Sequence, residues 1–350
     1  MTRKIDVGGV EIGGGAPVSI QSMCNTKTTD VVGSLAQIKA LYTAGCQIVR
    51  LTVPTLEAAQ TFGQIVQQSP LPLVADIHFD YRCAIAAAEQ GAAKIRINPG
   101  NIGSEDRVKA VVDCCKAHHI PIRIGVNGGS LEKDLLEKYG HPTAEALVES
   151  AFSHIALLEK YGFYDTCVSM KSSNVPLMMA AYRLFAERSD YPLHVGVTET
   201  GTEYMGTIKS AMGIGGLLCM GIGDTIRVSL TADPVREVEA AKAILKAAGL
   251  RKQGVNIISC PTCGRTQIDL IGLAGQVQEM VRDYPLDIKV AVMGCVVNGP
   301  GEAREADLGI AGGIGEGLLI RKGEIVKKLP EAELLGALRA ELDSLMEQRG

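Results

Sequence analysis

Short apolar segments rich in valine and isoleucine alternate along most of the chain with segments in which apolar residues recur at helical spacing. The alternation predicts eight strands, at residues 18–23, 48–53, 73–79, 94–98, 122–127, 167–171, 194–199 and 225–230. The helices predicted between them include residues 35–44, 81–90, 105–118, 143–161, 175–188 and 234–248. Eight strand–helix pairs in about 250 residues predict an α/β fold, a closed (β/α)8 TIM barrel.

An open, doubly wound sheet is the alternative architecture for this alternation. Its glycine fingerprint is missing, because no predicted strand leads through G-x-G-x-x-G into a helix and no G-x-x-x-x-G-K-[ST] motif occurs. Two glycine-rich stretches, 213–223 and 309–317, are interpreted as loops or loosely packed helix ends rather than phosphate-binding loops. The barrel is therefore the preferred prediction.

The alternation of predicted strands and helices stops after Leu250, at the polar run Arg251-Lys252-Gln253-Gly254. We place a domain boundary near residue 252, with a TIM-barrel domain at 1–252 and a second domain at 253–350. The second part is long enough for a small α+β domain with a terminal helix from about residue 330. A bound metal would help to stabilise a domain of this size.

Composition narrows the function classes. Of 350 residues, 46% are apolar and 21% charged, which is too apolar for a disordered chain. Lysine and arginine total 35 against 39 acidic residues, so a net charge of -4 offers no general surface for nucleic acid or anionic membrane. Uncharged stretches such as 210–223 are broken by glycines, and no apolar segment follows the basic start. We expect a cytoplasmic protein without a membrane span.

Polar residues stand in the last positions of almost every predicted strand. In a TIM barrel, the carboxyl ends of the strands form the active site. The residues at these positions are Arg50, Asp76, His78, Arg96, Asn98, Arg123, Asn127, Lys171, Glu199, Arg227 and Ser229. Several are two positions apart, so both members of such a pair lie on one face of the strand.

Four of these residues are arginines and one is a lysine. Asp76 and Glu199 cannot neutralise all five, and an unpaired buried cation costs several kcal/mol. The pattern predicts an anionic ligand with two or three charges, and a phosphate or diphosphate suits the fork of arginine. A strand-end ion pair or a plug of the barrel bottom is the alternative for any single arginine.

Two of the residues leave more than one role open. Lys171 is interpreted as a phosphate contact, with a Schiff-base nucleophile and a structural ion pair as alternatives. His78 is a candidate general acid or oxyanion donor, with a core histidine as the alternative.

Ten cysteines without a secretory signal favour reduced thiols over disulfides. Seven are interpreted as core residues: Cys24, Cys46, Cys83, Cys114, Cys115, Cys167 and Cys219. Cys260 and Cys263 form a Cys-x-x-Cys motif, and Cys295 follows in the same domain.

These three cysteines have the spacing of a metal site. No further cysteine or histidine occurs downstream, so three thiolates would leave a fourth ligand position open. A [4Fe-4S] cluster and a catalytic zinc both fit that arrangement. Glu302, Glu305 and Asp307 are the nearest carboxylates in sequence. A thioredoxin-like redox pair is the other interpretation, but it gives Cys295 no role.

Several long motifs match a known family. They are Val74-Ala75-Asp76-Ile77-His78-Phe79, Arg96-Ile97-Asn98-Pro99-Gly100-Asn101, Arg123-Ile124-Gly125-Val126-Asn127, Gly223-Asp224-Thr225-Ile226-Arg227-Val228-Ser229 and both cysteine motifs. With these segments the chain resembles the GcpE family of 4-hydroxy-3-methylbut-2-enyl diphosphate synthases, from about Gly13 to the end of the 309–317 loop.

The resemblance implies reductive ring opening and dehydroxylation of 2-C-methyl-D-erythritol 2,4-cyclodiphosphate in the non-mevalonate isoprenoid pathway. Electrons would come from reduced flavodoxin or ferredoxin through a [4Fe-4S] cluster. The same resemblance implies a head-to-tail homodimer in which the cluster domain of one chain caps the barrel of the other.

The family match also implies a role for each motif residue. The cluster ligands would be Cys260, Cys263, Cys295 and Glu302. The cyclodiphosphate would contact Arg50, Arg96, Arg123, Asn127, Lys171, Arg227 and Ser229, with His78. Glu199 would protonate the departing hydroxyl, with Asp76 near it.

The chain departs from the family pattern at two places. Ser172-Ser173-Asn174 follows Lys171 where relatives often have Ala-Ser-Asp, and Thr200 follows Glu199 where alanine is frequent, so Ser173, Asn174 and Thr200 are left without a role. Two other hypotheses compete with the reductase. One is a phosphate-binding lyase or aldolase that uses Lys171 and holds zinc at the cysteines. The other is a non-enzymatic electron-transfer or scaffold protein.

Overall fold

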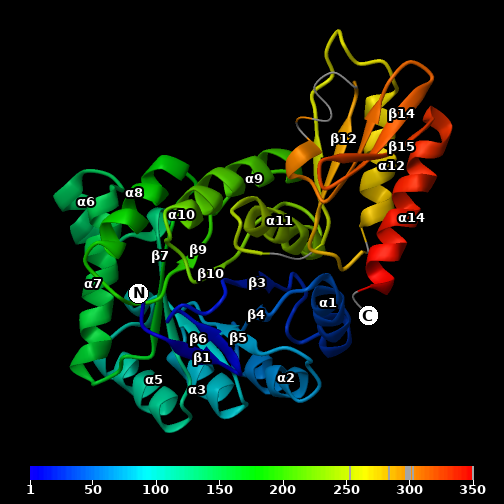
Figure 1. The fold of residues 1–350 in the computed structure, drawn as a ribbon. Helices are drawn as coiled ribbons and strands as arrows, with labels where there is room; N and C mark the ends of the chain where they lie inside the picture. Colours follow the sequence, from blue (N-terminus) through cyan, green and yellow to red (C-terminus); the bar gives the residue numbers. More distant parts are fainter. Residues whose placement is uncertain (252–253, 283, 296–300, 302, 349–350) are drawn as a thin grey trace. The chain divides into compact units, whose positions relative to one another are not determined.

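The computed structural model describes residues 1–251, 254–282, 284–295, 301 and 303–348. It divides into two compact units, Met1–Arg251 and Lys252–Gly350, and each is described by itself (Figure 1).

The first unit is built on eight parallel strands in the sheet order β8-β7-β6-β5-β4-β3-β10-β9. They are β3 (Ser19–Met23), β4 (Ile48–Thr52), β5 (Leu73–Asp76), β6 (Lys94–Ile97), β7 (Ile122–Asn127), β8 (Thr166–Lys171), β9 (His194–Val195) and β10 (Thr225–Ile226). A parallel bridge between Val168 and Leu193 joins the two ends of this order into a barrel. The predicted TIM barrel is confirmed.

Three strands end three or four residues earlier than predicted. β5 ends at Asp76, β9 at Val195 and β10 at Ile226. His78, Glu199, Arg227 and Ser229 therefore lie in the segments that follow their strands. Polar side chains that favour loops explain why these strands end early. Apolar periodicity alone does not distinguish the last residues of a strand from the segment that follows it.

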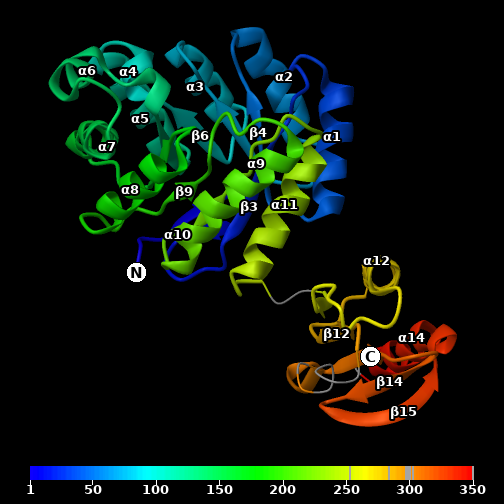
Figure 2. The same ribbon diagram turned by 90° about the horizontal axis from the view of Figure 1, so that it is seen from above.

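Helices lie on the outside of the strands (Figure 2). They are α1 (Val31–Ala44), α2 (Leu56–Val66), α3 (Tyr81–Glu89), α4 (Pro99–Ile102), α5 (Glu105–Ala117), α6 (Lys133–Tyr139), α7 (Ala144–Lys160), α8 (Val175–Ala186), α9 (Glu203–Ser210), α10 (Gly216–Cys219) and α11 (Pro234–Ala247), with a 3-10 turn at Gly128–Ser130. Side-chain caps mark the starts of several of them: Thr55 and Thr143 accept a backbone N–H at the starts of α2 and α7, and Asp233 precedes Pro234 in α11.

A hairpin not anticipated from the sequence covers the amino-terminal end of the barrel. It consists of β1 (Ile5–Val7) and β2 (Val10–Ile12), which pair antiparallel. Ile5, Val7 and Ile12 pack into one buried cluster with Ile48, Val74 and Cys167, which lie on barrel strands. The hairpin covers this end with apolar side chains.

The glycine-rich stretch 213–223 is largely helical rather than a loop. A π-helical segment (Ala211–Gly215) runs directly into α10. A Cβ at Gly213 would lie 2.8 Å from Met178, and one at Gly216 would lie 2.7 Å from Met179. These glycines therefore allow close packing against α8, which the sequence pattern does not reveal.

The second unit is a five-stranded sheet with helices. Its strands are β11 (Asn256–Ser259), β12 (Lys289–Met293), β13 (Leu308–Gly312), β14 (Glu316–Arg321) and β15 (Glu324–Pro330), paired in this order, the first three parallel and the last two antiparallel. The helices are α12 (Leu270–Val281) and α14 (Leu334–Glu347), with 3-10 turns at Ala303–Glu305 and Glu331–Glu333. Leu334, Leu338 and Leu342 recur every four residues and form the buried stripe of α14.

The second glycine-rich stretch, 309–317, belongs mostly to β13 and β14. A Cβ at Gly312 would lie 2.3 Å from Ile268, and one at Gly317 would lie 2.6 Å from Leu334. The expectation of a loop is therefore wrong, because these glycines admit neighbouring side chains onto the sheet.

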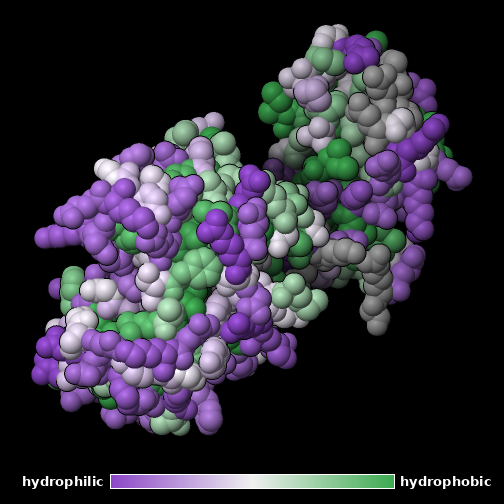
Figure 3. Space-filling view, turned by 90° about the vertical axis from the view of Figure 1, so that its left-hand side faces the viewer, coloured by the Kyte–Doolittle hydropathy of each residue, from purple (hydrophilic) through white to green (hydrophobic). Residues whose placement is uncertain are grey.

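The described cysteines form no disulfide with one another, and five of the seven predicted core cysteines are buried. Cys114 is half-buried, and Cys219 is exposed at the end of α10, so the core interpretation of Cys219 is wrong. Figure 3 shows one face on which hydrophilic residues predominate and hydrophobic residues lie between them. Among the described residues, no helix combines the length and apolarity needed to cross a membrane.

Tyr182 joins β8 to β9, where a single bridge closes the barrel. Its buried hydroxyl donates to the His194 carbonyl at 2.7 Å and accepts from the Met170 N–H at 3.0 Å. We expect Tyr182→Phe to lower the free energy of unfolding by about 1–3 kcal/mol, because two buried backbone groups lose their partner. Urea unfolding followed by circular dichroism measures the change. Tyr164→Phe, at an exposed tyrosine, is the control. Equal stability of the two variants would contradict this role of Tyr182.

Candidate active site

The register of the sheet directs the predicted strand-end residues into the barrel. Arg96 pairs with Asp76 on one side and Arg123 on the other, and Asn127 pairs with Lys171. The intervening residues, such as Ile95, Ile97 and Ile124, belong to the core cluster of the barrel. Because strand residues alternate between faces, the charged side chains share the inner face.

Asp76 is a buried carboxylate between two arginines. Its Oδ1 lies 3.1 Å from Arg96 Nη1, and its Oδ2 lies 3.8 Å from Arg50 Nε and from His78 Nε2. Burial acts to raise the pKa of Asp76, but the surrounding cations, Arg50 foremost, lower it to about 2. Asp76 is therefore ionised at neutral pH and orients the two arginines.

We call Arg50, Arg96, Arg123, Lys171 and Arg227 the five cations. Burial, followed by the four arginines of this set, lowers the pKa of Lys171 well below its usual value. Burial and the charges of Arg50 and Arg96 do the same to the pKa of Arg123. Burial also lowers the pKa of Arg50 to about 10, although Asp76 opposes the shift. These mutual effects require the five cations to lie close together.

Some donor atoms of this set have no partner. Among the described residues, Arg96 Nε and Arg123 Nε and Nη1 are buried and make no hydrogen bond. Arg96 Nη2 is occupied by Asn127. In the amide orientation that satisfies both polar atoms of Asn127, its side-chain oxygen accepts from Arg96 Nη2 at 3.3 Å. Unpartnered guanidinium donors at a polar site are what an anionic ligand satisfies.

Two glycines on the inner faces leave room for these cations. A Cβ at Gly125 would lie 2.5 Å from Arg96 Nε. A Cβ at Gly196 would lie 2.8 Å from Lys171 Nζ and 2.5 Å from the Arg227 carbonyl oxygen. Any other residue at either position would displace a cation or the backbone beside it.

Glu199 lies in the segment after β9 with a φ of 53°, in the left-handed region that residues other than glycine rarely adopt. Its neighbour Thr200 is buried and donates a hydrogen bond from Oγ1 to the Ser229 carbonyl. Thr200 thus ties the segment after β9 to the segment after β10. The Glu199 side chain is exposed, so it is accessible for proton exchange.

The other departures from the family pattern also have structural roles. Asn174 caps α8 by accepting a hydrogen bond from the Leu177 N–H at 3.0 Å. The Ser172 hydroxyl accepts from the Asn174 N–H at 3.1 Å. An asparagine caps a helix as well as an aspartate does, so Asn174 preserves the local structure.

Two inward-facing residues of the barrel were missed by the sequence analysis. Lys94 is fully buried two residues before Arg96, and burial lowers its pKa to about 8. Lys94 lies two residues before Arg96 in the same strand, and this spacing could have indicated that both side chains share the inner face. Glu237 on α11 forms an ion pair with Arg227, at 3.0 Å between Oε1 and Nη2. Nothing in a helical sequence distinguishes Glu237 from a solvent-facing acid.

The predicted thiolate ligands lie in the second unit. Cys260 follows β11 and Cys295 follows β12, the adjacent parallel strand. The Gly294 N–H donates to Cys260 Sγ at 3.2 Å, so the two strand ends are close. Hydrogen bonds from Arg265 lower the pKa of the Cys263 thiol, which favours its thiolate.

By residue type these cysteines suit an iron–sulfur cluster, since thiols and N–H···S contacts are typical of such a site. Within the described residues, no three histidine, cysteine or acidic side chains are close enough together to bind a metal. Glu302 lies outside the described residues.

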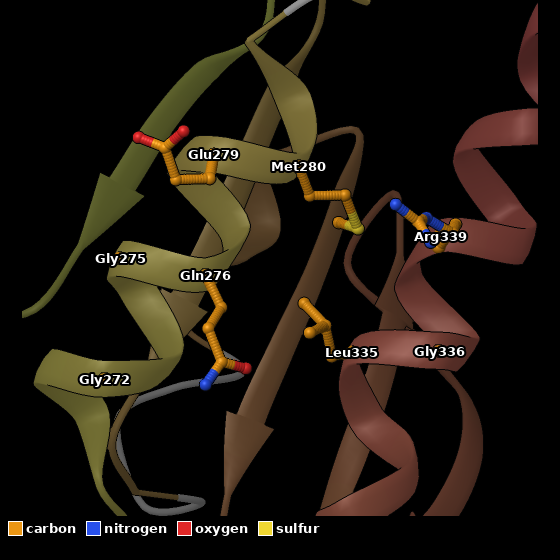
Figure 4. A pocket seen from close by; sticks show the side chains of 8 residues that line it. All are labelled: Gly272, Gly275, Gln276, Glu279, Met280, Leu335, Gly336 and Arg339. Carbon is orange, nitrogen blue, oxygen red and sulfur yellow. The ribbon is translucent and has the colours of Figure 1, made fainter.

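A groove of about 740 Å³ separates α12 from α14 in the same unit. In Figure 4, Gln276 and Met280 face Leu335 and Arg339 across it, and Glu279 points away. None of the described site residues lines this groove. The groove is therefore distinct from the candidate site residues that the structure describes.

The chain is similar over nearly its whole length to two bacterial proteins. It is 58% identical over 348 residues to the 4-hydroxy-3-methylbut-2-en-1-yl diphosphate synthase (flavodoxin) of Geobacter sulfurreducens, and the match covers 99% of each chain. It is 60% identical over 337 residues to the protein of the same name from Clostridium perfringens, covering 96% of this chain and 97% of the relative.

Two solved structures share the fold of the barrel. The dihydropteroate synthase from Stenotrophomonas maltophilia superposes with a TM-score of 0.52 at 13% identity, covering 70% of this chain and 98% of that one. The dihydropteroate synthase from Yersinia pestis gives a TM-score of 0.50 at 14% identity, covering 71% and 100%. At such identities the likeness shows the fold alone.

Both parts of the chain match described family domains. Residues 2–242 match the GcpE TIM-barrel domain, and residues 256–344 match the GcpE protein C-terminal domain. The resemblance found in the motifs is thereby confirmed. The chain belongs to the GcpE family, whose curated relatives are 4-hydroxy-3-methylbut-2-en-1-yl diphosphate synthases.

Proposed function

We propose that the chain opens the ring of 2-C-methyl-D-erythritol 2,4-cyclodiphosphate reductively and forms 4-hydroxy-3-methylbut-2-enyl diphosphate in the methylerythritol phosphate pathway. With the acids counted as neutral, the reaction takes up two electrons and two protons and releases one water. The activity follows from the name shared by relatives 58% and 60% identical over nearly the whole chain. The chain is an enzyme of this class.

The observation that carries the proposal is the convergence of the five cations inside the barrel. Asp76 and Glu237 are the buried carboxylates paired with them, so positive charge is in excess. A cyclic diphosphate carries two phosphoryl groups, and its oxygens would accept the unpartnered N–H groups of Arg96 and Arg123. Lys171, Arg227, Asn127, Ser229 and His78 complete the proposed substrate site.

Glu199 is the proposed proton donor to the departing hydroxyl. Its strained backbone places an accessible carboxyl in the segment after β9, beside the segment that carries Arg227. Strain of this kind persists where the surrounding structure enforces it, as the Thr200 contact does here. Asp76 was predicted to lie near this acid, and its proposed part is to hold Arg50 and Arg96 in place.

Cys260, Cys263, Cys295 and Glu302 are the proposed ligands of a [4Fe-4S] cluster. When bound, such a cluster supplies electrons one at a time. The relatives' name includes flavodoxin, and we propose reduced flavodoxin, with ferredoxin as the alternative, as the electron donor. A cytoplasmic location agrees with the free cysteines. The head-to-tail homodimer stays a prediction that sedimentation analysis would test.

Anaerobic purification tests the proposed function. We expect about four irons per chain, a brown colour, and consumption of the cyclodiphosphate with dithionite and a mediator. Cys263→Ser should lose most of the iron, because a hydroxyl is a poor iron–sulfur ligand. Cys219→Ser, at an exposed cysteine, should retain it. Zinc in place of iron, with no turnover, would contradict the proposal and favour the lyase alternative.

Gly125→Ala tests whether the position of Arg96 matters for the substrate. The new methyl group would displace the flexible Arg96 guanidinium rather than backbone. We expect KM for the cyclodiphosphate to rise about tenfold, since one charge-assisted hydrogen bond contributes about 1.5–3 kcal/mol. Gly129→Ala is the control, because nothing lies within 4 Å of a Cβ there. Equal KM values for the two variants would remove Arg96 from the substrate site.

Glu199→Gln tests the proton donor. We expect kcat to fall by a factor of about 10²–10⁴ at unchanged iron content, because the amide cannot supply a proton. Glu203→Gln, at the start of α9, changes an exposed acid that pairs with Arg236 and should leave kcat unchanged. If kcat of the Glu199 variant stays at the wild-type value, another group is the acid.

A further inference from the structure

Glu237 is a buried carboxylate that accepts four hydrogen bonds from three residues. It lies near the start of α11 and is 4% exposed. Its Oε1 accepts from Arg227 Nη2 at 3.0 Å and from the Leu230 N–H at 2.9 Å. Its Oε2 accepts from Arg227 Nε and from Ser22 Oγ at longer distances, 3.2 and 3.3 Å. One side chain thus connects α11 with β3 and with the segment after β10.

These contacts determine which donors of Arg227 remain available. A guanidinium has five N–H groups. Glu237 occupies one on Nε and one on Nη2, and Ser229 Oγ accepts from Nη1 at 2.6 Å. Two N–H groups are left, one on each terminal nitrogen. Both remaining N–H groups are available to oxygens of a phosphoryl group.

The backbone N–H of Arg227 donates to the Val195 carbonyl at 3.0 Å, but this bond does not orient the side chain. β10 ends at Ile226, so Arg227 lies beyond the last residue of the strand. Glu237 fixes the side chain of Arg227 and also the backbone N–H of Leu230, three residues further on. Without this carboxylate, the guanidinium would lose two of the three hydrogen bonds that orient it.

We propose that Glu237 is a positioning residue that holds Arg227 with two N–H groups directed to a phosphoryl group of the substrate. The inference rests on the proposed function, since it takes a diphosphate as the ligand of the five cations. Simple charge counting leads to the opposite expectation. Loss of a negative charge beside Arg227 would strengthen a phosphate site if only net charge mattered, whereas loss of orientation weakens it.

Glu237→Gln tests the proposal, because glutamine keeps the size of the side chain and removes its charge. The dissociation constant of the cyclodiphosphate is measured by calorimetry on the oxidised holoenzyme, which has no electrons for turnover. KM and kcat are measured with dithionite and a mediator. We expect the dissociation constant and KM to rise about tenfold, with kcat within about twofold of wild type.

A double-mutant cycle with Arg227→Ala separates positioning from a general structural role. In the Arg227→Ala background, Glu237→Gln should change the dissociation constant by less than about twofold, because the residue it orients is gone. Glu239→Gln, on the same helix in an exposed pair with Arg236, is the matched control and should behave as wild type. If the Gln variant does not fold, Glu237→Asp, which retracts the carboxylate, is expected to show the same rise.

Three results would overturn the proposal. A dissociation constant unchanged by Glu237→Gln shows that Arg227 needs no such support. An equal loss with and without Arg227 shows that Glu237 only stabilises the barrel. If Arg227→Ala itself binds the cyclodiphosphate as tightly as wild type, Arg227 is not part of the substrate site. That result contradicts the proposed function at Arg227, independently of Glu237.

Discussion

An excess of positive charge inside the barrel governs how this protein is built. Burying a cation without a partner costs several kcal/mol, and Arg123 and Lys171 are 1% and 7% exposed. Two buried carboxylates compensate part of this charge. Asp76 reaches Arg50 and Arg96 from a strand, and Glu237 reaches Arg227 from a helix. On our proposal, an anionic substrate compensates the remaining positive charge of the five cations.

An apolar hairpin covers the amino-terminal end of the barrel. The β1–β2 hairpin packs Ile5, Val7 and Ile12 against inward side chains at the amino-terminal end of the barrel. At the other end, Gly125 and Gly196 leave space for Arg96 and Lys171. The strands β9 and β10 are two residues long. Tyr182 contacts β9 itself, and Thr200 and Glu237 contact the segment after β10. Stability and function thus depend on the same few polar contacts near β9 and β10.

The sequence alone predicts the barrel, because alternation of strands and helices survives in the apolar pattern. It also predicts the inward cations, because a charge within an apolar strand is costly to bury unless a ligand or an ion pair compensates it. It does not predict Glu237, since a helical acid resembles any solvated acid until α11 is placed against β3. Cys219 and the glycines near residues 213 and 312 were misjudged for a related reason: exposure and close packing depend on neighbours far along the chain. The reaction followed from family motifs, not from periodicity.

A crystal structure of the holoenzyme with the cyclodiphosphate, prepared without reductant, would show directly whether the substrate completes this charge balance. We expect both phosphoryl groups to lie inside the barrel, within hydrogen-bond distance of Arg123, Lys171 and Arg227. We also expect Asp76 and Glu237 to keep their arginine partners in the complex. Phosphoryl groups bound elsewhere, with the five cations in contact only with protein or water, would contradict this electrostatic role of the barrel.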